Sequence, residues 1–109
     1  MIGVSVHSVD EIRANAVLVD YFQFGPVFPT PSKARYGPPQ GIVALEAAVA
    51  ACRAAGRPLI GVGGIDSTNV HAATATGAGG VAVIRAVMRA SDPGAETLAL
   101  FDAITRRRA

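Results

Sequence analysis

The sequence predicts an α/β fold of four strand–helix units, and two regularities lead to this prediction. Short apolar, β-branched runs alternate with helical segments along the 109 residues. The later runs are apolar at nearly every position, which is typical of strands buried on both faces of a parallel sheet. Half of the residues are apolar and 17% are charged, so the composition suits one folded domain over residues 1–109.

The first two units follow from local patterns. Residues 2–8 form a β-branched run, and Ser8 with Glu11 makes an S-x-x-E capping box that begins a helix to about residue 16. Residues 19–28 predict a second strand, rich in aromatic residues and ended by Pro and Gly. A loop with many prolines and glycines then leads to a helix over residues 41–56.

That helix and the third unit are bounded by glycines. Four residues of the helix share one apolar face, namely Ile42, Leu45, Val49 and Cys52. Gly56 suits the left-handed position that ends a helix. Residues 58–65 predict a third strand that ends in a double glycine, after which Asp66 or Ser67 is expected to cap a helix to residue 77.

The fourth unit contains a break. Residues 80–88 predict a strand that turns into a short helix near Arg85, and Asp92 with Pro93 opens the last helix. This last helix is expected to direct Leu98, Phe101 and Ile104 inward.

Chain length decides between two α/β architectures. A complete (βα)8 TIM barrel needs about 200–250 residues, so four βα units in this chain correspond to half of one. A small open flavodoxin-like sheet is the alternative, although that fold has a fifth strand. We therefore expect a half barrel of the (βα)8 type with a parallel sheet.

Chemically active residues gather where the strands end, which is where ligands bind in such folds. The four ends carry, in chain order, Ser5 and His7; Thr30, Ser32 and Lys33; Gly63 and Gly64; and Ile84 and Arg85. In the second half of a barrel, the last two ends are where a phosphate site commonly forms.

Two of these features have competing interpretations. The double glycine leaves backbone N–H groups open to a phosphate, with Arg85 adding charge, but Gly-Gly also makes tight turns without any ligand. His7 is a candidate general acid or base, whereas a lone histidine is often a structural group.

Other partners are not expected. The single Cys52 cannot form an internal disulfide, and its place on an apolar helix face argues against catalysis. Three arginines at 106–108 account for the formal charge of +2, without the interleaved aromatic residues of a nucleic-acid surface. No apolar run reaches the roughly 20 residues of a membrane helix, so we expect a cytoplasmic protein.

Four motifs together resemble a known family. "GVSVHS", "VDYFQFGPVFPTPSK", "IGVGGI" and "GVAVI" occur in the order and spacing of the last four strands of the thiamine phosphate synthase and TenI family of (βα)8 barrels. The resemblance covers essentially the whole chain and implies that it is the C-terminal half of such a barrel.

The resemblance implies roles for individual residues. In the synthase, an aminopyrimidine pyrophosphate ionises with the help of Mg²⁺, and the nitrogen of a thiazole phosphate captures the cation. The implied pyrophosphate contacts are Ser5, Thr30, Ser32 and Lys33, and the implied thiazole phosphate contacts are Gly63, Gly64, Ile84 and Arg85. Arg85 stands where the family commonly has Ser, and the Mg²⁺ ligands are expected in the missing half.

The resemblance leaves the reaction open. His7 lies in an S-V-H-S motif like that of TenI-type thiazole tautomerases, where it is the acid/base candidate, whereas the P-T-P-S-K loop with Lys33 favours the synthase. A half barrel that only binds phosphorylated ligands and a sugar-phosphate isomerase are further alternatives. The open strand edges imply self-association or a complementary N-terminal half.

Overall fold

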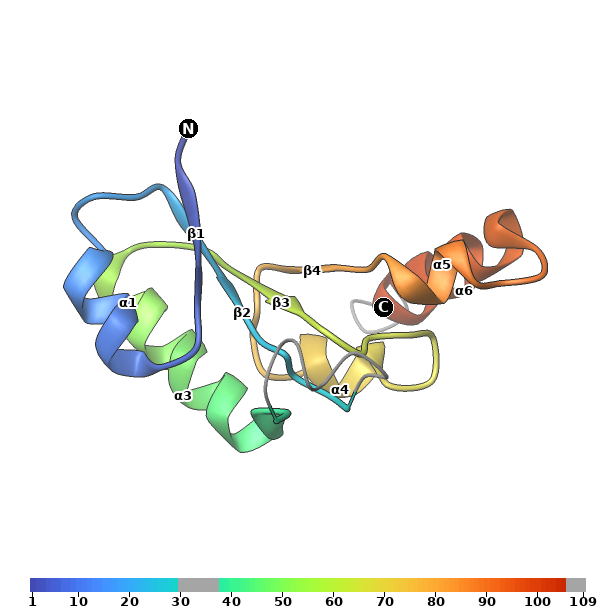
Figure 1. Cartoon of the computed structure of the whole chain (residues 1–109), viewed down its shortest axis with the longest axis horizontal. Helices are drawn as coiled ribbons and strands as arrows, with labels where there is room; N and C mark the ends of the chain where they lie inside the picture. The colour runs from blue at the N-terminus through green and yellow to red at the C-terminus, as the bar shows by residue number, and fades with distance from the viewer. Residues whose placement is uncertain (30–37, 106–109) are drawn as a thin grey trace.

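The structure is a computed structural model that describes residues 1–29 and 38–105. Strands and helices alternate along the chain in the predicted order (Figure 1). The elements are β1 (Gly3–Val6), α1 (Val9–Asn15), β2 (Tyr21–Phe24), α3 (Gly41–Ala55), β3 (Leu59–Val62), α4 (Val70–Thr74), β4 (Gly80–Ala82), α5 (Arg85–Met88) and α6 (Pro93–Thr105).

The four strands form one sheet in the order β1-β2-β3-β4, and every neighbouring pair is parallel. Each strand therefore lies next to the one that follows it in the chain, with a helix in between. This is the arrangement of half a closed barrel, and it confirms the predicted α/β half barrel with a parallel sheet.

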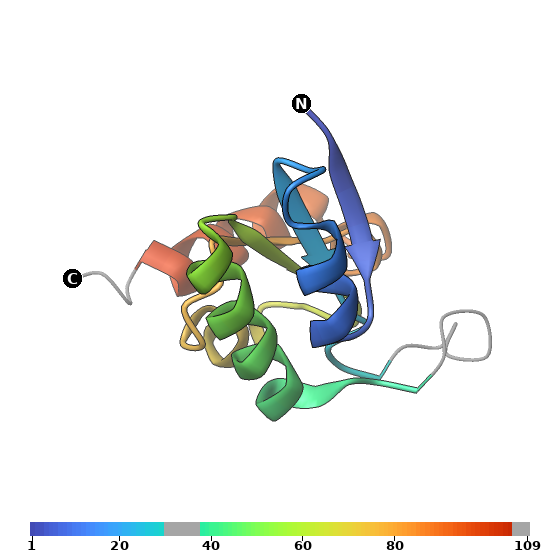
Figure 2. The same cartoon turned by 90° about the vertical axis from the view of Figure 1, so that its left-hand side faces the viewer.

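The sheet has one covered face and one bare face. Helices α1, α3 and α4 lie on the same side of it (Figures 1 and 2). On that side Val6, Phe22, Phe24 and Leu59 are at most 2% exposed. The alternate residues of the strands, such as Ser5 and Gln23, face the other side, which no described helix covers.

Two predicted helix ends are confirmed. The Ser8 hydroxyl accepts a hydrogen bond from the Glu11 N–H at 3.2 Å, and the Glu11 carboxylate accepts one from the backbone N–H of His7 at 2.8 Å. At the end of α3, Gly56 adopts φ 69°, and its N–H donates to the Arg53 carbonyl. On the predicted face of α3, Leu45, Val49 and Cys52 are buried and Ile42 is half-buried.

The strands are shorter than the sequence predicts. The second strand ends at Phe24 rather than near residue 28, because Pro26 has no N–H to donate to the ladder with β3. The third ends at Val62, since the double glycine that follows takes positive φ values. The predicted break after the fourth strand is confirmed, with α5 beginning at Arg85.

Two predictions about the last helices were wrong. Neither Asp66 nor Ser67 caps α4, which begins after Asn69, because the Asp66 carboxylate instead accepts the N–H of Thr68 at 2.9 Å within a turn. In α6 the buried residue is Leu100, and of the three predicted inward residues Ile104 is half-buried against the core, whereas Leu98 and Phe101 are exposed. Helix α6 packs on α4 and α5 through the face that carries Leu100, so Leu98 and Phe101 have no neighbour among the described helices.

Candidate functional site

The carboxyl ends of all four strands meet at one edge of the sheet. The register aligns Val6 with Phe24, Phe24 with Gly61, and Val62 with Ala82. The segments that directly follow these strands therefore lie along a common edge, and they contain His7, the double glycine and Arg85. Ligands of parallel α/β folds bind at this edge.

The first strand presents two polar side chains on the uncovered side. Ser5 is exposed, and its hydroxyl donates to Oε1 of Gln23, its register partner on β2, at 3.3 Å. His7 is also exposed, and its side chain makes no hydrogen bond to any residue of the described ranges. Gln23 was missed by the sequence analysis, although a polar residue within the apolar run YFQF indicated a special position.

The proline-rich loop that follows β2 begins and ends at the carboxyl edge of the sheet. Thr30, Ser32 and Lys33 lie outside the described residues. The chain leaves along β3, because Val27 N–H donates to the Val62 carbonyl at 2.9 Å. It returns at the same place, since the Gly41 N–H donates to the Val27 carbonyl at 2.9 Å. Both ends of the segment that carries the predicted pyrophosphate contacts are thus attached to this edge.

The double glycine is required by its surroundings. Gly63 has φ +96°, and a Cβ there would lie 2.5 Å from Cα of Pro26. Gly64 has φ +70°, and a Cβ there would lie 2.7 Å from the carbonyl oxygens of Phe28 and Pro29. The tight-turn interpretation is therefore correct as far as packing is concerned.

The backbone N–H groups of the same turn have no hydrogen-bond partner among the described residues. Within the described ranges, the backbone N–H groups of Gly63 and Gly64 donate to no residue. Successive free backbone N–H groups of this kind are the donors that anion sites use. The packing role and an anion-binding role are thus compatible.

Two side chains that the sequence analysis missed hold this turn. Asn69 donates from Nδ2 to the Gly64 carbonyl at 2.8 Å and accepts the Asp66 N–H at 2.9 Å. The Glu96 carboxylate, from α6, accepts the Ser67 N–H at 3.3 Å. The "DSTN" pattern could have indicated an Asn cap, but no local pattern reveals the contact from Glu96, 29 residues away.

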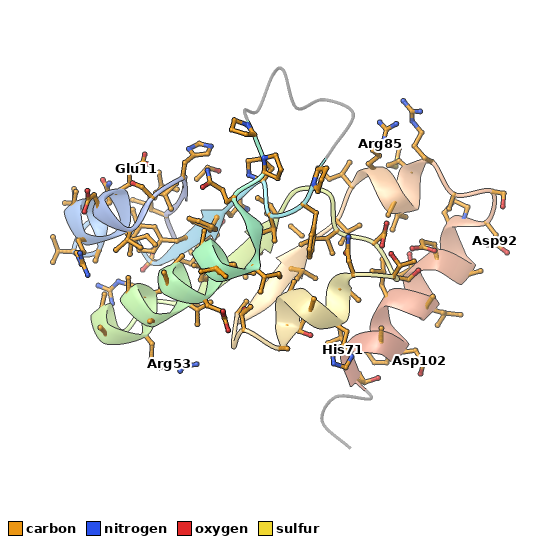
Figure 3. All side chains as sticks on the ribbon, turned by 90° about the horizontal axis from the view of Figure 1, so that it is seen from below. Glu11, Arg53, His71, Arg85, Asp92 and Asp102 are labelled. Atoms are coloured by element: carbon orange, nitrogen blue, oxygen red, sulfur yellow. The ribbon has the colours of Figure 1, made fainter. Side chains whose placement is uncertain are left out.

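The fourth strand end contributes charge. Ile84 is 77% exposed, and Arg85 begins α5 with its side chain pointing outward (Figure 3). The Arg85 guanidinium makes no hydrogen bond to any residue that the structure describes. Ser5, His7, Gly63, Gly64 and Arg85 therefore lie at the same edge of the sheet.

A metal site is not formed by the described residues. Among residues 1–29 and 38–105 there is no group of three or more His, Cys, Asp or Glu side chains that could hold a metal ion. Asp20 lies at the opposite edge, where its carboxylate accepts the Ile2 N–H at 2.6 Å. The described residues thus do not fit the Mg²⁺ that the family resemblance implies.

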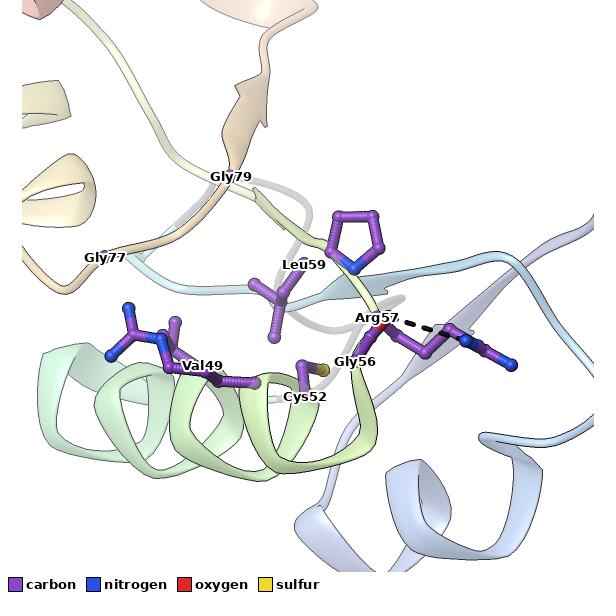
Figure 4. A pocket seen from close by; sticks show the side chains of 9 residues that line it. Val49, Cys52, Gly56, Arg57, Leu59, Gly77 and Gly79 are labelled. Carbon is purple, nitrogen blue, oxygen red and sulfur yellow. Dashed lines mark hydrogen bonds between the residues drawn. The ribbon is translucent and has the colours of Figure 1, made fainter.

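A hollow of about 300 Å³ lies at the opposite edge of the sheet, beside the starts of β3 and β4 (Figure 4). Burial raises the pKa of the Cys52 thiol there to about 11, which keeps it protonated near neutral pH. The Arg57 guanidinium points away from the hollow, and its Nε donates to the carbonyls of Ala16 and Val19 at 2.9 and 2.8 Å. These groups stabilise the fold and do not converge on a ligand.

No helix in the described ranges is long and apolar enough to cross a membrane. This finding concerns residues 1–29 and 38–105 only.

Comparisons with known proteins identify the family. The family described as thiamine monophosphate synthase matches residues 1–87. The thiamine-phosphate synthase of Listeria welshimeri is 45% identical over 95 residues, which are 84% of this chain and 44% of that protein. That of Moorella thermoacetica is 39% identical over 109 residues, 99% of this chain and 50% of that protein.

A solved structure of a related protein has the same fold over its matching half. The thiamine phosphate pyrophosphorylase from Pyrococcus furiosus superposes with a TM-score of 0.84 at 32% identity, over 96% of this chain and 48% of that one. The chain thus spans about half the length of the relatives it matches. By sequence and by fold, the chain belongs to the thiamine monophosphate synthase family.

Proposed function

We propose that this chain provides the anion-binding half of a thiamine-phosphate synthase active site. The observation that carries the proposal is that the backbone N–H groups of Gly63 and Gly64, on the same sheet edge as Ser5 and Arg85, donate to no described residue. The substrates of the proposed reaction are an aminopyrimidine pyrophosphate and a thiazole phosphate. Both carry anions that such donors bind.

Each phosphate group has its own set of residues in this proposal. The thiazole phosphate binds at the double glycine, with Ile84 and Arg85 closing the site from β4. Arg85 replaces the hydroxyl donor that the family commonly has, since a guanidinium offers several N–H donors to a phosphate. Asn69 holds the Gly64 carbonyl at 2.8 Å and so orients the donors of the turn.

The pyrophosphate binds nearer to the first two strands. Ser5 contributes its hydroxyl, and Thr30, Ser32 and Lys33 contribute from the segment whose ends are attached beside the double glycine. A lysine close to the departing pyrophosphate stabilises the charge that forms as the carbon–oxygen bond breaks. The nitrogen of the thiazole then attacks the pyrimidine cation.

Turnover requires more than this chain in our proposal. Its relatives are about twice as long, and the described residues contain no metal site. A complementary half barrel therefore supplies the pyrimidine contacts and any Mg²⁺ ligands. Isolated, the chain binds phosphorylated ligands without condensing them.

Calorimetry of thiazole phosphate binding tests the proposed phosphate site. Arg85→Ala is expected to weaken binding by about tenfold or more, since a charge-assisted hydrogen bond is lost. Arg89→Ala is the matched control, because Arg89 is an exposed arginine one turn further along and outside the site. Equal effects of the two changes, or no binding by the unaltered chain, would refute the phosphate site.

Turnover tests the role of Lys33. The chain is mixed with the segment of the Moorella thermoacetica synthase that it does not match, and formation of thiamine phosphate is measured. Lys33→Ala is expected to abolish the restored activity, whereas Arg35→Ala serves as a control in the same loop. Activity that survives Lys33→Ala would contradict the assigned role.

A thiazole tautomerase is the second candidate, and His7 is the reason for it. Its imidazole is exposed at the end of β1, beside Ser5, which suits an acid/base group that moves a proton on a bound thiazole. The same mixture assayed with a carboxythiazole phosphate separates the two reactions. His7→Asn removes tautomerisation if this candidate is correct, and leaves condensation in place if the synthase is correct.

A further inference from the structure

The large exposed apolar residues concentrate in the first and last strand–helix units. The first flank consists of Met1, Ile2, Val17 and Leu18, and the last flank consists of Ile84, Met88, Leu98 and Phe101. Of the exposed large apolar side chains in the described ranges, the remaining one is Val43 on α3. The two flanks lie at opposite ends of the sheet (Figure 1). Such concentration indicates two contact surfaces rather than scattered surface residues.

Each flank also carries an open strand edge. Among the described residues, β1 pairs only with β2, and β4 pairs only with β3. The backbone N–H and C=O groups on the outer edges of β1 and β4 are therefore available to another strand. Since all four strands are parallel, the edge of β4 can continue the sheet with a strand equivalent to β1.

From these features we infer that two copies of this chain join flank to flank into a closed, eight-stranded barrel. The two-fold axis runs parallel to the strands, so that all eight strands point the same way. The β4 strand of each copy pairs with β1 of the other, which removes every open edge. One copy covers 48% of the Pyrococcus furiosus chain that it superposes on, so two copies have the strand number and length of one barrel.

The exposed apolar residues of α6 indicate that a second copy covers the last flank. Leu98 and Phe101 are three residues apart on α6 and are 69% and 64% exposed, whereas Leu100 is 7% exposed against the body of the chain. A helix with apolar residues on two faces requires a neighbour on each. The helix α1 of the second copy, with Val17 and Leu18 behind it, is the neighbour that this arrangement provides.

Charges on the two flanks are complementary. Asp10 and Glu11 lie in the first turn of α1, just after the carboxyl end of β1. Arg85 and Arg89 lie in and after α5, just after the carboxyl end of β4. Pairing β4 with β1 of the second copy brings the arginines and the acids to the same end of the barrel, with opposite signs facing.

Closure explains why two copies suffice. An interface between unlike flanks either repeats into an open filament or closes into a ring. Two copies supply eight strands, and side chains can fill the interior of an eight-stranded barrel. The uncovered sheet face, with Ile60 and Val62 on it, then becomes that interior. Pairing of like flanks would leave the other apolar flank of each copy exposed. This inference does not depend on the proposed reaction.

The mass of the isolated chain is the direct test. Sedimentation velocity and native mass spectrometry are expected to give a species of twice the 11.1 kDa chain. Phe101→Lys is expected to raise the dissociation constant by about 100-fold, because each dimer buries this side chain twice. Val43→Lys is the matched control, since Val43 is 80% exposed but lies outside both flanks. The inference would be overturned if the unaltered chain were monomeric at about 100 µM. It would also be overturned if Val43→Lys weakened the dimer as much as Phe101→Lys does.

Charge reversal tests the pairing of unlike flanks. Arg89→Glu is expected to weaken the dimer, and adding Asp10→Lys to the same chain is expected to restore it, because the two positions meet across each contact. A dimer in which the second change gives no recovery would favour like-flank pairing and overturn the inference. So would a series of larger assemblies, or a monomer that associates only with the unmatched half of the Moorella thermoacetica synthase.

Discussion

Gly64 and Gly56 share a backbone conformation but differ in how closely other atoms surround them. Gly64 and Gly56 have nearly the same backbone angle, φ +70° and +69°, but a Cβ at Gly56 would meet no atom within 4 Å. At Gly64 it would lie 2.7 Å from two carbonyl oxygens. Alanine at either position pays the left-handed backbone penalty of about 1–2 kcal/mol. At Gly64 the steric conflict with backbone atoms adds roughly 1–3 kcal/mol.

Urea unfolding measures this difference. At one fixed protein concentration, Gly64→Ala is expected to lower the free energy of unfolding by about 2 kcal/mol more than Gly56→Ala does. Gly64→Ala is also expected to lose thiazole phosphate binding, whereas Gly56→Ala retains it because Gly56 lies at the opposite edge. Equal destabilisation by the two changes would refute the close approach between the double glycine and the proline segment.

Three further predictions concern parts of the chain outside the site. Arg57→Ala should lower the free energy of unfolding by about 2 kcal/mol, because two partly buried hydrogen bonds from a charged donor to the carbonyls of Ala16 and Val19 are lost. Ser8→Ala should cost about 1 kcal/mol through the lost helix cap, again in urea unfolding. Burial raises the pKa of Cys52 to about 11 from 9.0, so ionisation favours the unfolded chain. In urea unfolding, the free energy of unfolding relative to a Cys52→Ala variant should not change with pH below pH 9 and should fall as pH rises toward 11.

The sequence predicted what depends on neighbours along the chain. The order of four strand–helix units, the cap at Ser8 and the left-handed end at Gly56 follow from local patterns, and the structure confirms them. The lengths of the strands were not predictable in the same way. A strand ends where its ladder of hydrogen bonds to a neighbouring strand ends. The ladder of β2 depends on β3, and β3 begins at Leu59, 35 positions after β2 ends at Phe24.

In the candidate site, too, local features could be predicted from the sequence and long-range contacts could not. The residues after each strand could be assigned to one edge, because parallel strands bring their carboxyl ends together. The partners of those residues could not. Ser5 meets Gln23 only through the register of β1 with β2, and Ser67 meets Glu96 only because α6 packs on α4. A single sequence contains the side chains but not these pairings.

The wrong prediction for α6 connects fold and assembly. The apolar spacing of Leu98 and Phe101 is that of a buried helix face, yet the chain alone leaves this face in solvent. An exposed apolar helix face of this kind marks a contact surface, which another chain can cover. If the second copy occupies both flanks, a complementary half barrel has to displace it, because both use the edges of β1 and β4. The dimer would then hold the anion-binding edge in a folded, protected form, and thiamine phosphate formation in the mixed assay would slow as the concentration of this chain increases over that of its complement.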